Sequence, residues 1–224
     1  LLLDKNGKPH KEGTIIKNEK YAMTLEQIRD HPEYFYNGPL AKSISQDIRI
    51  SIPDEQRKGQ VTEQDLRNYR TVIREPLEME LAGMKMLLTP PPTSGAVLGL
   101  ILNILKGYNM TSSARDGTEA SVLTYHRIIE AFKFAYARRS RLGDPADFLC
   151  LIFPHFSFQI AQEMIQQHFG DDLRRHINDN RTYNNVSYYA RSYSGADYGT
   201  THVAVLAKNG DAVSVTSTIN YRFV

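Results

Sequence analysis

Cysteine is almost absent from this sequence of 224 residues. Cys150 is the single one, so no disulfide can form within the chain. No Cys-x-x-Cys pair and no cluster of cysteine with histidine suggests zinc. His126 and Glu130 stand one helical turn apart, but the second histidine of a metalloprotease motif is missing. We therefore expect neither a metal site nor a cofactor.

Long apolar runs and strong charge are also lacking. The longest apolar run, Phe148–Phe153, is far too short to cross a bilayer. The net charge is only +2, and no basic stripe is interleaved with aromatic residues, which excludes nucleic acid as a partner. A hydrophobic content of 41% and a charged content of 23% are typical of an ordinary globular protein.

Two further features bear on where the protein works and on its extent. Asn-x-Ser/Thr sequons at Asn109, Asn180 and Asn185 are candidate glycosylation sites, and they weakly favour a secreted chain. The sequence starts without methionine and stops at Val224, within what its pattern predicts to be a strand. We expect the chain to be a fragment of a longer protein.

The first half of the sequence is predicted to be mainly helical. Thr24 can cap a helix over residues 24–30, and Thr62 with Asp65 has the spacing of a capping box. Residues 75–89 alternate apolar and polar side chains, which predicts a β-hairpin.

Two stronger helices follow. The first is predicted within the apolar stretch 96–107 and ends at Gly107. The second is predicted over residues 125–142 with Thr124 as its cap. Its predicted buried stripe consists of Ile128, Ile129, Phe132, Ala135 and Tyr136.

The last segment is the most informative. Two strands, 201–207 and 212–220, meet at Lys208-Asn209-Gly210, a strong hairpin signal. A three-residue loop with Gly210 in the left-handed region pairs Val203 with Val215, whereas a two-residue loop pairs Val203 with Thr216. Apolar cross-strand pairs contribute about 0.2–1 kcal/mol each, so we expect the three-residue loop.

In that register, hydroxyl groups gather on one face of the hairpin. The valines form the other, apolar face. The polar face carries Thr200, His202, Thr216, Thr218 and Asn220. Threonine is simply a good strand former, but a cluster of hydroxyls and an amide opposite an apolar face also suggests a site with a nucleophile.

The hairpin sequence TTHVAVLAKNGDAVSVTSTIN resembles the start of the small subunit of γ-glutamyltransferases (glutathione hydrolases). The upstream stretches YFYNGPLAKSISQDI, VTEQDLRNYR, PPPTSGAVLGLILNILKGYN and LTYHRIIEAFKFAYARRSRLGDP extend the resemblance over most of the chain. The stretch Ala146–Gln159 departs from the family pattern, and its role stays open. The resemblance implies the α/β fold of N-terminal nucleophile hydrolases, with four αββα layers, present here in part. Residues 1–199 would then belong to the large-subunit region and 200–224 to the small-subunit region.

The resemblance also implies a chemistry. The precursor would cut itself between Gly199 and Thr200, and the new N-terminal Thr200 would attack the γ-glutamyl amide and form an ester. Its free α-amine, with a reference pKa of about 7.7–8.0, would act as the general base. His202 would then be structural. Thr218 corresponds to the family threonine that orients the nucleophile, and Asn220 to the asparagine that holds the donor's α-amino group.

The implied substrates are glutathione and other γ-glutamyl compounds. The acceptors would be water, amino acids or dipeptides. The implied assembly is a large/small subunit heterodimer from one precursor, at the cell surface. The donor-binding arginine and the glycine pair of the oxyanion hole have no counterpart in this chain, so we expect it to be inactive alone. Two alternatives stay open: another amide-specific acylase of the same fold, and a catalytically dead remnant with a binding or structural role.

Overall fold

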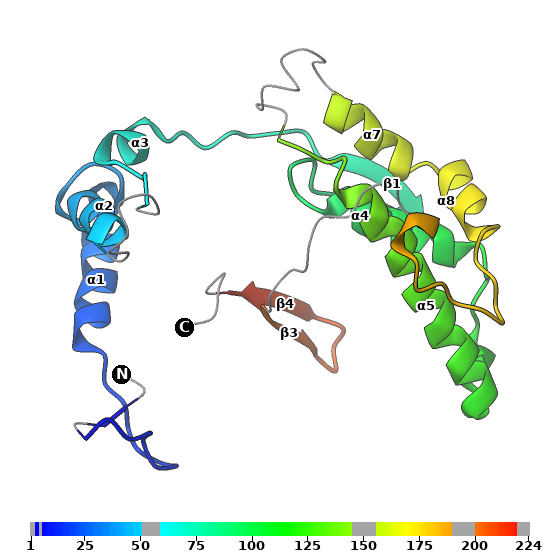
Figure 1. The fold of residues 1–224 in the computed structure, drawn as a ribbon, viewed down its shortest axis with the longest axis horizontal. Coiled ribbons are helices and arrows are strands. Elements are labelled where there is room, and N and C mark those ends of the chain that lie inside the picture. The colour runs from blue at the N-terminus through cyan, green and yellow to red at the C-terminus, as the bar shows by residue number, and fades with distance from the viewer. Residues whose placement is uncertain (1–2, 5, 51–58, 145–155, 190–199, 219–224) are drawn as a thin grey trace. The chain divides into compact units, whose positions relative to one another are not determined.

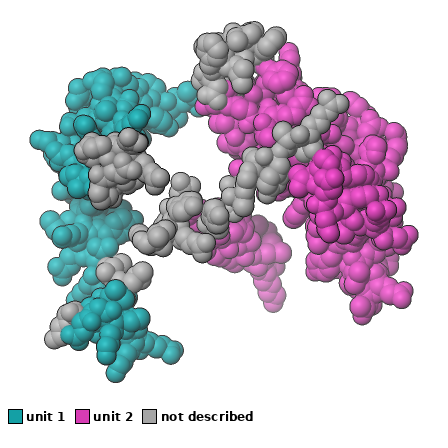
Figure 2. All heavy atoms as spheres, viewed as in Figure 1, with its two compact units in different colours: residues 1–73 teal, residues 74–224 magenta. Residues whose placement is uncertain are grey.

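The computed structural model describes residues 3–4, 6–50, 59–144, 156–189 and 200–218. These residues form helices and two small antiparallel sheets (Figure 1). The chain divides into two compact units, residues 1–73 and 74–224 (Figure 2). The predicted processing boundary at residue 199 concerns a cut in the chain rather than packing, and it stays a prediction.

Unit 1 is helical in its described part, as predicted. Its elements are α1 (Glu19–Asp30), η1 (Pro32–Phe35), α2 (Pro39–Ile50) and α3 (Glu63–Asn68). The predicted capping box of α3 is confirmed, because the Asp65 N–H donates to the Thr62 hydroxyl and the Thr62 N–H donates to the Asp65 carboxylate.

The predicted start of α1 is wrong. The helix begins five residues earlier, and the Asn18 side chain caps it by accepting a hydrogen bond from the Tyr21 N–H. Thr24 lies inside the helix, where its hydroxyl donates to the Lys20 carbonyl at 3.0 Å. Threonine can bond to a carbonyl one turn back as well as cap a helix, so its presence alone does not place a helix start.

Unit 2 contains the hydrophobic core. Its elements are β1 (Leu77–Leu81), β2 (Met84–Leu88), α4 (Gly95–Lys106), η3 (Ser112–Arg115), α5 (Gly117–Arg139), α7 (Phe156–Met164), α8 (Gln167–Arg174), η4 (Val186–Tyr188), β3 (Thr201–Leu206) and β4 (Ala212–Ser217). The predicted hairpin over residues 75–89 is confirmed as β1 and β2, which pair antiparallel with Leu77 opposite Leu88. Its two turn residues, Ala82 and Gly83, both have positive φ, as a tight two-residue turn requires.

Helix α4 lies at the centre of this core and packs against α5, α7 and α8 and against strands β1 and β2. Leu100 and Ile104 on α4 are completely buried. Gly99 allows close packing, since a Cβ there would come within 2.8 Å of the side chains of Ile165 and Leu88. The buried Asn103 side chain donates to the Ile165 carbonyl at 2.7 Å, which fixes the junction between α7 and α8.

The prediction for α5 is wrong in its start and in its buried face. The helix begins at Gly117, and the Thr124 hydroxyl donates to the Ala114 carbonyl instead of capping a helix. Ile129, Phe132 and Tyr136 are exposed by 45–56%. The buried positions are Glu130, Ala131, Phe134 and Ala135, so Ala135 alone of the predicted stripe is buried. The helix therefore packs against the core with a different face from the predicted one. This face includes the carboxylate of Glu130.

Candidate active site

The β3–β4 hairpin has the predicted register. Val203 pairs with Val215, Val205 with Val213, and Thr201 with Ser217. The strands are joined by a three-residue loop that the Ala207 N–H and Asp211 carbonyl close at 2.8 Å. Gly210 has a φ of +93°, which a residue with a Cβ rarely adopts. The three-residue loop is thus confirmed.

The two faces of the hairpin differ in chemistry. The four valines lie on one face, each exposed by 54–56%. His202 lies on the other face, where its Nδ1 is 2.8 Å from the Thr216 hydroxyl and its Nε2 is 3.3 Å from the Ser214 hydroxyl. Both ring nitrogens therefore have partners on the neighbouring strand. The structural role of His202 stays a prediction.

Thr200 and Thr218 flank the paired strands. Thr200 immediately precedes β3 and Thr218 immediately follows β4, and both are exposed. Continuing the register by one pair sets Thr200 opposite Thr218 on the face of His202. Thr201 lies on the valine face, opposite Ser217. Gly199 and Asn220 lie outside the described residues.

A second polar cluster lies in the core and was missed by sequence reasoning. Glu130 on α5 is only 1% exposed. Its Oε1 accepts hydrogen bonds from the Lys133 ammonium at 2.8 Å and the Thr182 hydroxyl at 2.6 Å. Its Oε2 accepts one from the Tyr189 hydroxyl at 2.7 Å. The only signal in the sequence was an acidic residue among apolar ones, and its partners Thr182 and Tyr189 stand 52 and 59 positions away.

The partners of Glu130 keep it ionised despite its burial. Burial by itself raises the pKa of this carboxyl, but the hydrogen bonds from Lys133, Thr182 and Tyr189 outweigh it and leave the pKa below its ordinary value. Burial likewise acts to lower the pKa of Lys133, and the bond to Glu130 reverses this and raises it. A buried charge with three donors is well compensated.

The histidine next to this cluster on α5 has a structural partner. His126 Nε2 lies 2.9 Å from the Asn178 carbonyl. Its neighbour Arg127 forms a bidentate ion pair with Asp179, in which Nε donates to Oδ1 at 2.9 Å and Nη2 donates to Oδ2 at 2.6 Å. No group of three side chains able to hold a metal ion occurs within the described ranges.

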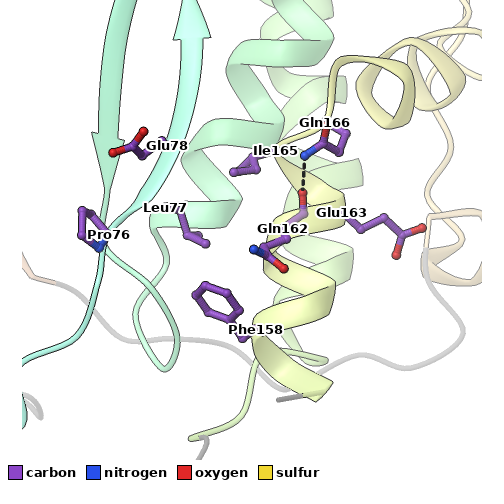
Figure 3. A pocket seen from close by; sticks show the side chains of 8 residues that line it. All are labelled: Pro76, Leu77, Glu78, Phe158, Gln162, Glu163, Ile165 and Gln166. Atoms are coloured by element: carbon purple, nitrogen blue, oxygen red, sulfur yellow. Dashed lines mark hydrogen bonds between the residues drawn. The ribbon is translucent and has the colours of Figure 1, made fainter.

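A groove occurs among the described residues of unit 2. It has a volume of about 600 Å³ and lies between β1 and the α7–α8 junction (Figure 3). Phe158 and Gln162 of α7 face Leu77, whereas Glu163 extends away from the cavity. The groove is lined by Pro76, Leu77, Glu78, Phe158, Gln162, Glu163, Ile165 and Gln166. This set contains no hydroxyl or thiol side chain.

Asn109, Asn180 and Asn185 are all exposed, as glycosylation would require. Among the described residues, no helix has both the length and the apolar character needed to span a bilayer.

The model of the gamma-glutamyltranspeptidase family matches residues 1–224, the whole chain. The chain belongs to this family. It is 38% identical over 224 residues to glutathione hydrolase 2 of Arabidopsis thaliana, with 99% of this chain and 36% of that protein covered. It is also 38% identical over 205 residues to the glutathione hydrolase 5 proenzyme of Rattus norvegicus, with 90% of this chain and 33% of that protein covered.

A solved structure gives the same relationship. The crystal structure of Helicobacter pylori gamma-glutamyltranspeptidase is 26% identical, with a TM-score of 0.61 over 88% of this chain and 52% of that one. The architecture of the present chain thus matches part of the fold of that solved γ-glutamyltranspeptidase. The chain spans about a third of the length of the curated relatives that it matches.

Proposed function

We propose that this chain carries the nucleophile hairpin of a γ-glutamyltransferase (glutathione hydrolase) with the four-layer αββα fold. In this proposal Thr200 is the nucleophile, and the bond between Gly199 and Thr200 is the site of self-cleavage. The observation that supports it most is the register of β3 and β4, because continuing it by one pair beyond Thr201 and Ser217 would set Thr200 opposite Thr218 on the polar face. The presence of "proenzyme" in a relative's name supports a processed precursor.

The roles follow from the chemistry of each group. The Thr200 hydroxyl attacks the γ-glutamyl carbonyl, and its α-amine, free after the cut, accepts the hydroxyl proton. The amine of glutathione's cysteinyl-glycine portion leaves with a proton, and a γ-glutamyl ester remains on Thr200. Water releases glutamate from this ester, or an amino acid or dipeptide takes the γ-glutamyl group.

Two neighbours would assist this reaction. Thr218 orients the Thr200 hydroxyl by a hydrogen bond across the hairpin. Asn220 accepts a hydrogen bond from the donor's α-ammonium through its amide oxygen. In this proposal the chemistry takes place at the open end of the hairpin, beside Thr200 and Thr218. The proposed assembly is a large/small subunit heterodimer, with residues 1–199 and 200–224 in different subunits, facing the outside of the cell.

Replacing Thr200 by Ala in the full-length precursor tests the proposal. We expect loss of both self-cleavage and glutathione turnover, because one hydroxyl performs both steps. Denaturing gels with N-terminal sequencing follow the cut, and release of a chromogenic amine from a γ-glutamyl anilide follows turnover. Thr218→Ala is the companion variant, expected to slow turnover while leaving donor binding largely intact. A Thr200→Ala precursor that still separates into two subunits would show that the cut lies elsewhere.

A further inference from the structure

The three Asn-x-Ser/Thr sequons differ in what holds the hydroxyl group that each of them needs. Such a sequon is recognised through the asparagine amide and through the hydroxyl two residues later. In the sequon of Asn180 this hydroxyl belongs to Thr182. It donates to the buried carboxylate of Glu130 at 2.6 Å and accepts a hydrogen bond from the Lys133 ammonium. Its single proton and one of its lone pairs are therefore engaged by α5.

The backbone around Asn180 is also fixed. The Arg181 N–H donates to the Asn178 carbonyl at 3.2 Å, and the Asn180 N–H donates to the Asn178 side-chain oxygen at 2.9 Å. The residue between them, Asp179, is held by the bidentate ion pair with Arg127 of α5. An enzyme that binds this sequon must therefore break contacts with α5 as well as open a tight turn.

The other two sequons have only local contacts at their hydroxyl groups. In the sequon of Asn109, the Thr111 hydroxyl lies 2.7 Å from the hydroxyl of Ser113. In the sequon of Asn185, the Ser187 hydroxyl donates to the side-chain oxygen of Asn185 itself at 2.8 Å. All five of these residues are exposed. Freeing either hydroxyl breaks no hydrogen bond to a buried group.

We propose that the bond between Thr182 and Glu130 makes Asn180 a poor glycan acceptor once unit 2 has folded, whereas Asn109 and Asn185 stay acceptors. In the modification, the asparagine Nδ2 forms a bond to the anomeric carbon of an oligosaccharide carried on a lipid diphosphate. Nδ2 loses a proton, and the lipid diphosphate leaves. Modification of Asn180 thus competes with the folding of unit 2. The inference goes beyond the proposed function and does not involve Thr200.

The strength of the bond sets the size of the expected effect. A hydrogen bond to a charged group is enough to shift an equilibrium by about tenfold or more. For each sequon we compare the rate of modification in the folded protein with the rate in a short peptide around it. This ratio should be at least about tenfold lower for Asn180 than for Asn109 or Asn185. Dividing by the peptide rate removes any difference between threonine and serine sequons.

The experiment uses the full-length precursor made without glycans in a bacterial host. The folded protein and the three peptides are incubated with a purified single-subunit oligosaccharyltransferase and a lipid-linked oligosaccharide. Mass spectrometry of proteolytic fragments gives the initial rate at each asparagine. Because all three sites are measured in the same molecules, Asn109 and Asn185 serve as internal controls for Asn180.

Glu130→Gln tests whether the carboxylate is the cause. The variant keeps the size of the side chain, but a hydrogen bond to a neutral amide is only about half as strong as one to a carboxylate. We expect a several-fold faster modification of Asn180 with no change at the other two sites. Glu119→Gln is the matched control, since Glu119 is exposed and lies on the first turn of the same helix. If Glu130→Gln does not fold, the three-site comparison in the wild type decides alone.

Three outcomes would overturn the proposal. Equal ratios at the three sites would show that the contact with α5 does not protect Asn180. An unchanged rate at Asn180 in Glu130→Gln would remove Glu130 as the cause. Faster modification at all three sites in this variant would show a general loosening of the fold. Self-cleavage of a Thr200→Ala precursor would reject the proposed function and leave each of these outcomes readable.

Discussion

The core around α4 and the β3–β4 hairpin are built from similar residues but bury them very differently. Leu100 and Ile104 of α4 are completely buried, whereas the four valines of the hairpin are each exposed by 54–56%. In the core, interlocking side chains hold the elements together. In the hairpin, cross-strand pairs and a loop fix the register, and a two-stranded sheet of this kind is only marginally stable in water by itself. Stability and proposed chemistry therefore reside in different parts of the chain.

The largest test of this comparison concerns activity of the 224-residue chain alone. We expect no detectable turnover of a γ-glutamyl anilide, because these 224 residues span only about a third of the length of the curated relatives, and a site assembled from the rest of such a protein would be incomplete. A single oxyanion-hole donor is typically worth about 10²–10³ in rate. Turnover that disappears in Thr200→Ala would mean that the hairpin and the core already form a complete site.

A pair of truncations tests the difference in burial directly. Leu100→Ala should lower the free energy of unfolding of this chain by about 2–5 kcal/mol, since it leaves a cavity in the core. Val215→Ala on the open face of the hairpin should change it by only about 0.5 kcal/mol. Urea denaturation followed by circular dichroism measures both. Similar losses for the two variants would contradict the division between core and hairpin.

The smallest effect is a pH dependence that belongs to the core. The pKa of Glu130 is lowered in the folded chain, so its stabilising effect is present above the ordinary pKa of glutamate and is lost as the pH falls through the lowered value. The difference in melting temperature between wild type and Glu130→Gln should therefore be largest near neutral pH and should shrink in acid. Thermal melts at several pH values measure it. A constant difference would mean that Glu130 is not ionised in the fold.

Sequence reasoning succeeded where contacts are local. The register of the hairpin follows from valine pairing and from Gly210, and the capping box of α3 follows from the spacing of Thr62 and Asp65. Residues close in sequence determine these features, so they can be predicted from a single chain. The polar face beside Thr200 follows from the same register.

The errors arose where distant residues decide. The predicted buried face of α5 assumed that apolar side chains point inward, but Glu130 is buried because Thr182 and Tyr189 approach from far along the sequence. The starts of α1 and α5 were misplaced because Thr24 and Thr124 bond to carbonyl groups rather than cap a helix. The role of Asn220 could be inferred only from family resemblance, and its position lies outside the described residues.

The imidazole of His202 can report the register of the β3–β4 hairpin in an NMR experiment. Both of its nitrogens contact hydroxyls of β4, one on Thr216 and one on Ser214. A slip of one residue between the strands would exchange these partners and turn the ring toward a different set of side chains. The nitrogen chemical shifts of this one ring therefore encode the alignment of Thr200 with Thr218. An NMR spectrum of a histidine-labelled sample can monitor the alignment of the proposed nucleophile without any substrate.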